Sequence, residues 1–207
     1  MQERITGYGQ RGIPDRAMKV IAITGGIGSG KSTVSRMLRV MGYSVYDCDS
    51  RARQLMDSSD EIKGEIRRLI GASAVSDAGV IDRQLIACRV FADAALLRGL
   101  NSIVHPRVRR DLRLWIEEHS EENVVFVETA ILEESGLKEE VDDVWQVWAP
   151  EEIRVRRVMH RSGLTETEVR ARLSSQMSCA ECHLGDIVND EVTAITPQIV
   201  LRLGKCR

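Results

Sequence analysis

The sequence of 207 residues predicts an α/β fold with a parallel β-sheet. Two observations favour this class: short apolar runs that do not alternate with polar residues, and segments of helical periodicity between them. Residues 19–24 (KVIAIT) are almost continuously apolar, which is typical of a strand that is buried on both faces. Apolar side chains at helical spacing follow over 34–41, and a second strand is expected at 43–46. Together these segments predict a β–α–β unit of about 30 residues.

The next segment, from about residue 50 to residue 120, has a mostly helical pattern. Apolar residues recur at helical spacing over 55–70, and further helices are expected at 82–100 and 106–118, separated by the segment 103–106 (IVHP). About seventy residues of helix are too many for a simple crossover between two parallel strands. We therefore expect an inserted helical lobe.

The last third of the chain alternates between strands and helices again. Pro150, followed by Glu151 and Glu152, suits a helix N-terminus, and Gly163 is expected to join two arginine-rich helices. The elements expected here are strands at 123–129, 141–148 and 187–188, and helices at 150–161, 165–177 and 197–203.

The composition predicts a globular protein with nearly balanced charge. The chain has 29 Lys and Arg residues against 31 Asp and Glu residues, which gives a net charge of −2. This balance does not favour binding to nucleic acid or to an anionic membrane. No apolar run approaches the roughly 20 residues that a membrane-spanning helix needs, and residues 1–19 contain no apolar signal segment. We therefore expect a cytoplasmic protein, and the sequence leaves protein partners open.

The five cysteines are expected to be reduced thiols, because their number is odd and no export signal is present. Residues 179–183 (CAECH) match the C-x-x-C-H pattern of covalent haem attachment. That pattern normally belongs to exported proteins, and no second Cys or His pair has the spacing of a zinc site. Cys179 and Cys182 are therefore expected to be ordinary thiols one helical turn apart.

Residues 25–32 (GGIGSGKS) fit the pattern G-x-x-x-x-G-K-[ST] of a phosphate-binding loop, or P-loop, with a strand before it and a helix after it. Glycine lets the backbone N–H groups curve around phosphate oxygens without Cβ clashes. Lys31 would neutralise the β- and γ-phosphates, and the Ser32 hydroxyl can ligate Mg²⁺. The motif indicates nucleotide binding but not what the nucleotide is used for. The residues expected to bind ATP are Gly25, Gly26, Ile27, Gly28, Ser29, Gly30, Lys31, Ser32 and Thr33.

Carboxylates follow two of the expected strands. Asp47 and Asp49 end the second strand, and ligands of such sheets lie at the carboxyl ends of the strands. Alternate residues of a strand point to opposite sides, so only one of the two is expected to face the site. The alternative is an acidic strand end that caps the next helix. Glu128 ends the strand at 124–127, where a carboxylate is the usual partner of a P-loop Mg²⁺, although Asp is commoner there.

A group of arginines surrounds Gly163. Most of them are expected to lie on the solvated faces of amphipathic helices. One or two could instead close over ATP and stabilise the charge on the transferring phosphoryl group. The six arginines are Arg154, Arg156, Arg157, Arg161, Arg170 and Arg172.

Several of these motifs resemble the dephospho-CoA kinase family. The P-loop alone is generic, whereas the D-x-D, V-H-P and R-x-G-L patterns together are specific, and the likeness spans about residues 18–203. The matching segments are 24–34 (TGGIGSGKSTV), 45–49 (VYDCD), 103–106 (IVHP), 157–165 (RVMHRSGLT), 170–177 (RARLSSQM) and 188–190 (VND).

The resemblance implies a P-loop kinase with a three-layer α/β/α core, a helical lobe for the CoA substrate and a helical lid. It also implies the reaction, which is ATP-dependent phosphorylation of the 3′-hydroxyl of dephospho-CoA, the last step of coenzyme A synthesis. The expected division is a flexible leader at 1–17, a core at about 18–50, 121–150 and 178–203, a CoA lobe at about 51–120, a lid at about 151–177 and a tail at 204–207.

The family pattern also suggests roles for single residues. The family's proposed base, the second Asp of D-x-D, corresponds to Asp49, and its lid arginine corresponds to Arg161. The Asn near the adenine falls on Asn189. The residues expected at the acceptor substrate are Asp49, Arg83, His105 and Glu128.

The chain departs from the family pattern in three segments. Residues 130–133 (AILE) lack a proline, Ser162 replaces the common lid Asp, and residues 183–187 (HLGDI) replace an A-D-Y-V-I stretch. None of these changes removes a group that phosphoryl transfer needs.

Two other classes of P-loop protein remain to be weighed. A GTPase or other nucleotide-dependent switch would normally carry N-K-x-D and D-x-x-G motifs, and neither is found. Another nucleoside or nucleotide kinase would share the core and the lid. The long helical insertion favours a large acceptor such as a pantetheine-bearing nucleotide.

Overall fold

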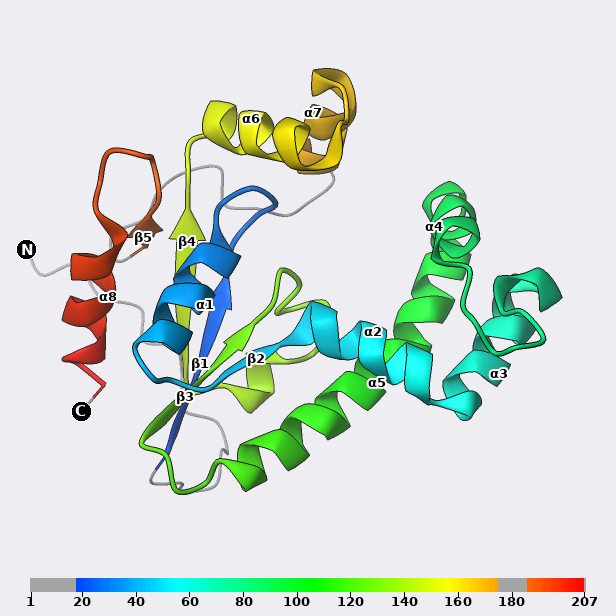
Figure 1. Ribbon diagram of the computed structural model, residues 1–207, viewed down its shortest axis with the longest axis horizontal. Helices are drawn as coiled ribbons and strands as arrows, with labels where there is room; N and C mark the ends of the chain where they lie inside the picture. Colours follow the sequence, from blue (N-terminus) through cyan, green and yellow to red (C-terminus); the bar gives the residue numbers. More distant parts are fainter. Residues whose placement is uncertain (1–17, 175–185, 207) are drawn as a thin grey trace, which may run out of the picture.

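The computed structural model describes residues 18–174 and 186–206. Within these residues, five parallel strands form one sheet in the order β2-β3-β1-β4-β5 (Figure 1). This arrangement confirms the predicted α/β fold with a parallel sheet. The strands are β1 (Lys19–Thr24), β2 (Val45–Asp47), β3 (Val124–Glu128), β4 (Asp143–Trp148) and β5 (Ile187–Val188).

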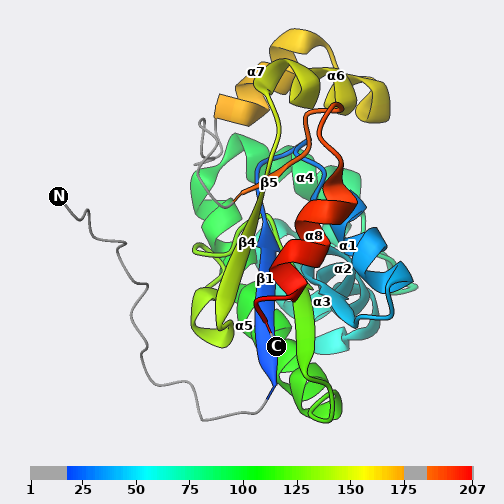
Figure 2. The same ribbon diagram turned by 90° about the vertical axis from the view of Figure 1, so that its left-hand side faces the viewer.

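Helices cover both faces of the sheet, and alternate residues of β1 show why. Ile21 and Ile23 are buried against α1 (Lys31–Val40) and α8 (Ile195–Leu203) on one face. Val20 and Ala22 point to the opposite face and pack against the other helices. Figure 2 shows α1 and α8 together on one side of the sheet. The core therefore has three layers, and β1 is apolar on both faces, as the unbroken run at 19–24 predicts.

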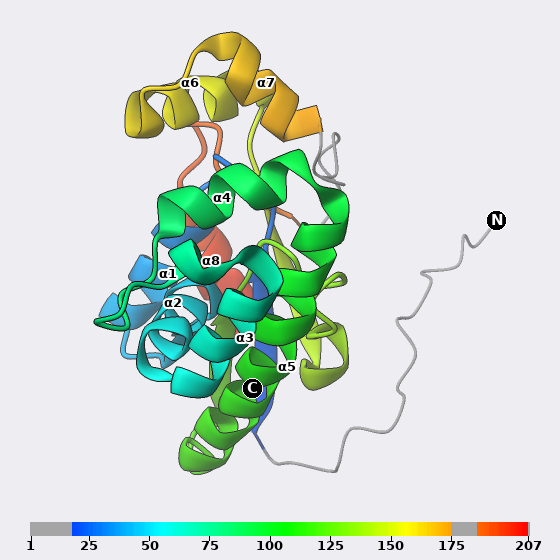
Figure 3. The same ribbon diagram turned by 90° about the vertical axis from the view of Figure 1, so that its right-hand side faces the viewer.

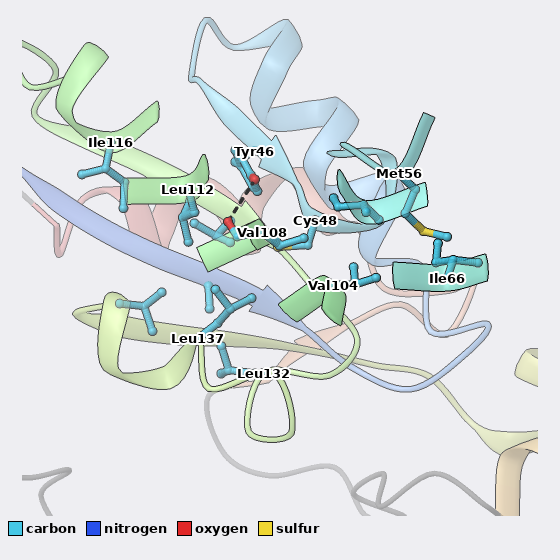
Figure 4. Packing of buried hydrophobic residues seen from close by; sticks show 14 of the residues in the cluster. Tyr46, Cys48, Met56, Ile66, Val104, Val108, Leu112, Ile116, Leu132 and Leu137 are labelled. Atoms are coloured by element: carbon cyan, nitrogen blue, oxygen red, sulfur yellow. Dashed lines mark hydrogen bonds between the residues drawn. The ribbon is translucent and has the colours of Figure 1, made fainter. Parts of the chain in front are cut away.

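A helical lobe is inserted between β2 and β3, as the sequence predicts (Figures 1 and 3). Its helices share one apolar core with the nearer face of the sheet, in which Ile66, Val104 and Leu112 are buried (Figure 4). The elements of the lobe are α2 (Cys48–Ser58), α3 (Asp60–Ile70), the short η1 (Ala72–Ala74), α4 (Arg83–Ala92) and α5 (Ala94–Glu118).

The predicted helix break at 103–106 is wrong, because Pro106 lies inside α5. The break falls instead at Asp93, whose carboxylate accepts hydrogen bonds from the backbone N–H groups of Ala95 and Leu96 and so begins α5. A proline inside a helix removes one backbone hydrogen bond and costs about 3 kcal/mol or more. Val104 and Val108, on either side of it, are both buried in the lobe. Packing therefore keeps the helix continuous against local propensity.

A polar network joins the lobe to the sheet close to the predicted site. The Tyr46 hydroxyl donates a hydrogen bond of 2.7 Å to Asp111 of α5. Arg51 of α2 donates two more to the same carboxylate, at 2.8 and 2.6 Å. Burial and the neighbouring Asp111 raise the pKa of Tyr46, so its hydroxyl keeps its proton. The network fixes the start of α2 relative to β2 and α5.

The segment expected to form the lid is a helical hairpin beyond the carboxyl ends of the strands, formed by α6 (Glu151–Ser162) and α7 (Glu166–Ser174) (Figures 1 and 3). Helix α6 begins after Pro150 and ends at Gly163, whose positive φ of 67° glycine adopts without strain, as the sequence indicates. Another short helix, η2 (Lys138–Glu140), lies between β3 and β4. No helix in the described ranges is both long enough and apolar enough to span a bilayer.

Candidate active site

The P-loop connects the end of β1 to the start of α1 and requires glycine at two crowded positions. At Gly25, with φ 145°, a Cβ atom would lie 2.3 Å from the carbonyl oxygen of Val147. At Gly30, with φ 98°, it would lie 1.9 Å from Nδ2 of Asn189. Neither contact is possible for a real side chain, so the strands and loops around the P-loop approach its backbone directly.

Lys31 is the first residue of α1, and its ammonium group lies over the loop. Nζ donates hydrogen bonds to the carbonyl oxygens of Gly25 at 2.6 Å and Gly26 at 3.2 Å. Burial lowers the pKa of Lys31 to about 8, and the nearby carboxylates of Glu128 and Asp49 oppose this shift. The group is still mostly protonated at neutral pH. Its charge is poorly solvated, so an anion in the loop would stabilise it.

Ser32 and Glu128 meet at the carboxyl edge of the sheet. The Ser32 hydroxyl donates a hydrogen bond of 2.6 Å to Oε1 of Glu128, and Glu128 is paired in register with Asp47 on β2. A hydroxyl and a carboxylate are oxygen ligands that suit Mg²⁺. The described residues include no group of three or more His, Cys, Asp or Glu side chains that could hold a metal. The pair therefore fits a Mg²⁺ ion that nucleotide phosphates help to bind.

Asp47 and Asp49 differ sharply in their contacts. Strand β2 ends at Asp47, whose carboxylate accepts hydrogen bonds from the backbone N–H groups of Asp49 and Ser50 and from the Ser50 hydroxyl. It is the N-cap of α2. Asp49 lies in the first turn of α2, is exposed, and its carboxylate has no hydrogen-bond partner among the described residues. Its charge nevertheless acts on Lys31.

The alternation argument for this pair is therefore wrong. Residues two apart on a strand share one face, so alternation would not have separated Asp47 from Asp49, and Cys48 and Asp49 are helical rather than extended. The strand is shorter than predicted, and the N-cap bonds of Asp47 begin the helix at Cys48. The alternative reading, an acidic strand end that caps the next helix, applies to Asp47. Cys48 is buried, and burial raises the pKa of its thiol to about 12, so it is no nucleophile at neutral pH.

The lid arginines separate into paired and unpaired groups. Arg170 binds Glu151, Glu152 and Glu166 at 2.6 to 2.8 Å. Arg161, in the last turn of α6, is exposed and makes no hydrogen bond or ion pair with any described residue. It lies close enough to Lys31 to help lower the pKa of that lysine. Arg161 thus has a guanidinium group that is unpaired among the described residues and whose charge acts on Lys31.

Two other lid arginines bind the P-loop itself, which the sequence reasoning did not single out. Arg154 is 6% exposed, and its Nε donates to the Ile27 carbonyl at 2.9 Å. Arg157 donates to the carbonyls of Gly28 and Ser29. Residues 154, 157 and 161 are spaced i, i+3 and i+7, which places them on one face of a helix. That spacing is the signal that would have separated them from the other arginines.

The remaining predicted site residues lie in different surroundings. Asn189 follows β5 and is buried, and its Nδ2 donates to the Ser29 carbonyl at 2.8 Å. Arg83, the first residue of α4, binds the Asp57 carboxylate at 2.7 Å within the lobe. His105 is half-buried on α5, where burial and Arg109 lower its pKa, so its ring is neutral at physiological pH. The structure brings Asn189 to the P-loop, but it describes no contact of Arg83 or His105 with the loop.

Three predicted features fall outside the described residues. These are the leader at 1–17, the last residues of the expected helix and lid at 175–177, and the C-x-x-C-H segment at 179–183.

Comparison with known proteins agrees with this arrangement. A family model described as dephospho-CoA kinase matches residues 19–194. The chain belongs to the dephospho-CoA kinase family. A dephospho-CoA kinase of Bacteroides fragilis (strain YCH46) is 38% identical over 183 residues, covering 87% of this chain and 89% of the relative. One from Porphyromonas gingivalis is 43% identical over 159 residues, covering 77% and 78%.

Solved structures show the same fold. The crystal structure of TT1252 from Thermus thermophilus has 37% identity and a TM-score of 0.71, and the match covers 91% of this chain and 95% of that one. A dephospho-CoA kinase from Campylobacter jejuni has 22% identity and a TM-score of 0.61, with coverage of 90% and 97%. This kinase of the dephospho-CoA kinase family is therefore an enzyme that phosphorylates dephospho-CoA with ATP in coenzyme A biosynthesis. The predicted resemblance and activity are confirmed.

Proposed function

We propose that this kinase transfers the γ-phosphoryl group of ATP to the 3′-hydroxyl of the dephospho-CoA ribose, with Mg²⁺ bound beside Ser32, and that it works in the cytoplasm. The choice of the 3′-hydroxyl follows the family resemblance, and the observation that supports a hydroxyl acceptor at this site is the Asp49 carboxylate. It is exposed, lacks a hydrogen-bond partner among the described residues, and acts electrostatically on Lys31. An acceptor hydroxyl bound between Asp49 and the P-loop would meet both the base and the phosphoryl donor.

The P-loop would bind the nucleotide. Residues 25–33 would hold the ATP phosphates through backbone N–H groups and the N-terminus of α1, while Lys31 neutralises the β- and γ-phosphates. Ser32 and Glu128 would hold Mg²⁺, since their oxygens lie 2.6 Å apart at the same edge. When bound, the ion would neutralise charge on the phosphate oxygens.

The transfer step depends mainly on position and charge, because phosphoryl transfer has a loose transition state. Asp49 would orient the 3′-hydroxyl and accept its proton as the oxygen–phosphorus bond forms. Arg161 would contact the transferring group, because its guanidinium has no described partner and lies near Lys31. A cation there would stabilise the negative charge that spreads over the phosphoryl oxygens.

The helical lobe would bind the rest of the acceptor. We place the CoA lobe at about 51–120 and the lid at about 151–177, with Arg83, His105 and Glu128 as acceptor-binding residues together with Asp49. In support, Asp49 lies in the first turn of α2, the first helix of the lobe, and α4 lies below α6 and α7 in Figure 3. Arg83 would have to exchange part of its Asp57 contact for a phosphate of the substrate.

A coupled assay of ADP release tests this proposal. Dephospho-CoA should support turnover, whereas AMP, CMP and a reaction without acceptor should give background rates. ³¹P NMR of the product should show a 3′-phosphomonoester. Removal of Mg²⁺ with EDTA should stop the reaction, and added Mg²⁺ should restore it. A phosphate on another hydroxyl, or equal turnover with AMP, would contradict the proposal.

A further inference from the structure

The P-loop is held from its outer side by residues that follow it by more than 120 positions. Arg154 Nε donates to the Ile27 carbonyl at 2.9 Å. Asn189 Nδ2 donates to the Ser29 carbonyl at 2.8 Å, and Arg157 Nη1 donates to the same oxygen at 3.4 Å. We call Arg154, Arg157 and Asn189 the P-loop brace. The brace binds backbone oxygens, whereas a phosphate-binding loop uses backbone N–H groups.

The geometry of the peptide unit links these two sets of groups. The described peptide bonds are all trans, so each carbonyl points opposite to the N–H of the next residue. A brace that holds the Ile27 and Ser29 carbonyls outward therefore turns the N–H groups of Gly28 and Gly30 the other way, towards the inside of the loop. Neither N–H donates to an acceptor among the described residues.

The charge around the loop also favours an anion. Arg154 is buried, and its Nη2 has no hydrogen-bond partner in the described part of the chain. Its charge helps to lower the pKa of Lys31. Two poorly solvated cations thus flank a loop whose free N–H groups point inward. Phosphate oxygens would satisfy both the charges and the N–H donors.

We propose that Arg157 is a positioning residue for ATP. Through the Ser29 carbonyl it orients the N–H group of Gly30 before the nucleotide arrives, while Arg154 holds the Gly28 N–H group through the Ile27 carbonyl. The Arg157 guanidinium contacts two segments at once, the P-loop and the turn at Asn189. Nη1 lies 3.3 Å from the Gly28 oxygen, and Nη2 lies 3.1 Å from both the backbone oxygen and Oδ1 of Asn189. The planar fork of an arginine can make such divergent contacts, whereas the ammonium of lysine cannot.

Glu191 fixes Arg157 from the other side. Its carboxylate lies 3.2 Å from Nε of Arg157 and also binds Arg156. Glu191 has a φ of 70°, the only positive φ of a non-glycine residue within the described ranges. Such a conformation is unfavourable for Glu and persists where surrounding contacts determine it. The Asp190 carboxylate, which accepts hydrogen bonds from the N–H groups of Val192 and Thr193, holds this turn. The turn places the Glu191 carboxylate on Arg157, so Glu191 acts on the loop through Arg157.

Donors that are oriented in advance need no rearrangement when the ligand binds, so losing the brace should weaken phosphate binding specifically. The inference rests on the placement of ATP in the P-loop under the proposed function. It can be tested without turnover, by calorimetry with ADP and with inorganic tripolyphosphate. A failure of the inference would therefore leave the acceptor assay unaffected.

The central variant is Arg157→Lys, which keeps the charge but loses the fork. We expect its Kd for ADP and for tripolyphosphate, and its KM for ATP, to rise about tenfold, the effect of losing about two modest hydrogen bonds. Its KM for dephospho-CoA and its kcat should stay within about twofold. Arg156→Lys is the matched control, because Arg156 binds Glu191 but makes no contact with the P-loop among the described hydrogen bonds and ion pairs. That control should bind ADP like the wild type.

A second variant covers the case in which Arg157→Lys folds poorly. Glu191→Gln should raise the Kd for ADP about two- to fourfold without changing the thermal midpoint, since exposed ion pairs contribute little stability. Glu152→Gln, a lid carboxylate that binds Arg170, should change neither quantity. Wild-type ADP affinity in both Arg157→Lys and Glu191→Gln would overturn the inference. So would an equal loss of ADP and dephospho-CoA binding that follows a fall in the thermal midpoint, because that is the signature of a merely structural role.

Discussion

The arginines at the two ends of helix α6 differ in their contacts and in their exposure. Near its start, Arg154 and Arg157 are bound to P-loop carbonyls and are largely buried. In its last turn, Arg161 is exposed and has no described partner. The turn after β2 repeats the contrast within three residues. Asp47 is the N-cap of α2, whereas the Asp49 carboxylate has no hydrogen-bond partner in the part of the chain that the structure describes.

This difference separates two tasks of a kinase site. Groups that shape the phosphate cradle must be fixed before the substrate arrives, because oriented donors bind an anion at lower cost. Groups that act on the acceptor and on the transferring phosphoryl must instead keep their hydrogen-bonding atoms available for these ligands. In this molecule, the groups that shape the loop have partners within the fold. The charged groups expected to act on the ligands, Asp49 and Arg161, lack such partners among the described residues and act on Lys31.

The largest effect is expected at Lys31, because this residue is part of the P-loop site and also supplies the positive charge that neutralises the phosphates. Lys31→Ala should abolish transfer, because no other group replaces the ammonium at the β- and γ-phosphates. The thermal midpoint should change little, since burial already disfavours the charged lysine, as its pKa of about 8 shows. Steady-state kinetics beside a thermal melt measure both. Near-normal turnover in a folded Lys31→Ala would rule out the P-loop as the site of transfer.

A smaller but selective effect is expected for the unpaired lid arginine. Arg161→Ala should lower kcat by about 10- to 100-fold and raise KM much less, because its interaction is made mainly in the transition state. Arg170→Ala is the matched comparison, since Arg170 is occupied by three glutamates. Its kcat should stay near that of the wild type. If the two variants lost similar activity, partner contacts would not distinguish catalytic from structural arginines.

The smallest effect is expected at the paired carboxylate. Asp47→Ala should lower the free energy of unfolding by about 1 kcal/mol through loss of the N-cap of α2. Asp47→Asn should keep most of that stability, because asparagine caps a helix about as well as aspartate does. Denaturant unfolding at neutral pH gives both values. Equal stability of the alanine variant and the wild type would show that the cap bonds of Asp47 are not needed to hold α2.

Much of the fold could be predicted because its signals are local. The unbroken apolar run at 19–24, the glycines of the P-loop and the Pro150 start of α6 each specify a backbone conformation by their own chemistry. The course of α5 through Pro106 could not be predicted in this way. Packing of Val104 and Val108 with distant helices decides it, and local propensity at proline points to a break.

The candidate site divides in the same way. Lys31 and Ser32 follow from a motif within eight residues, so the sequence identifies them. The roles of the lid arginines depend on what each one meets in space, and for Arg157 this is Asn189 and Glu191, more than thirty residues later. The sequence alone does not distinguish the roles of Asp47 and Asp49. Only the end of β2 at Asp47 shows that one of them is a cap.

The most direct test of the contrast between free and engaged groups is the single-turnover rate of Asp49→Asn against Asp47→Asn with dephospho-CoA. A general base contributes about 10²- to 10⁴-fold, so we expect Asp49→Asn to lose at least about 100-fold. Its affinity for ADP by calorimetry should be unchanged, and Asp47→Asn should react at close to the wild-type rate. An inactive Asp47→Asn beside an active Asp49→Asn would contradict the assignment, and the acceptor site would then have to be rebuilt around Asp47.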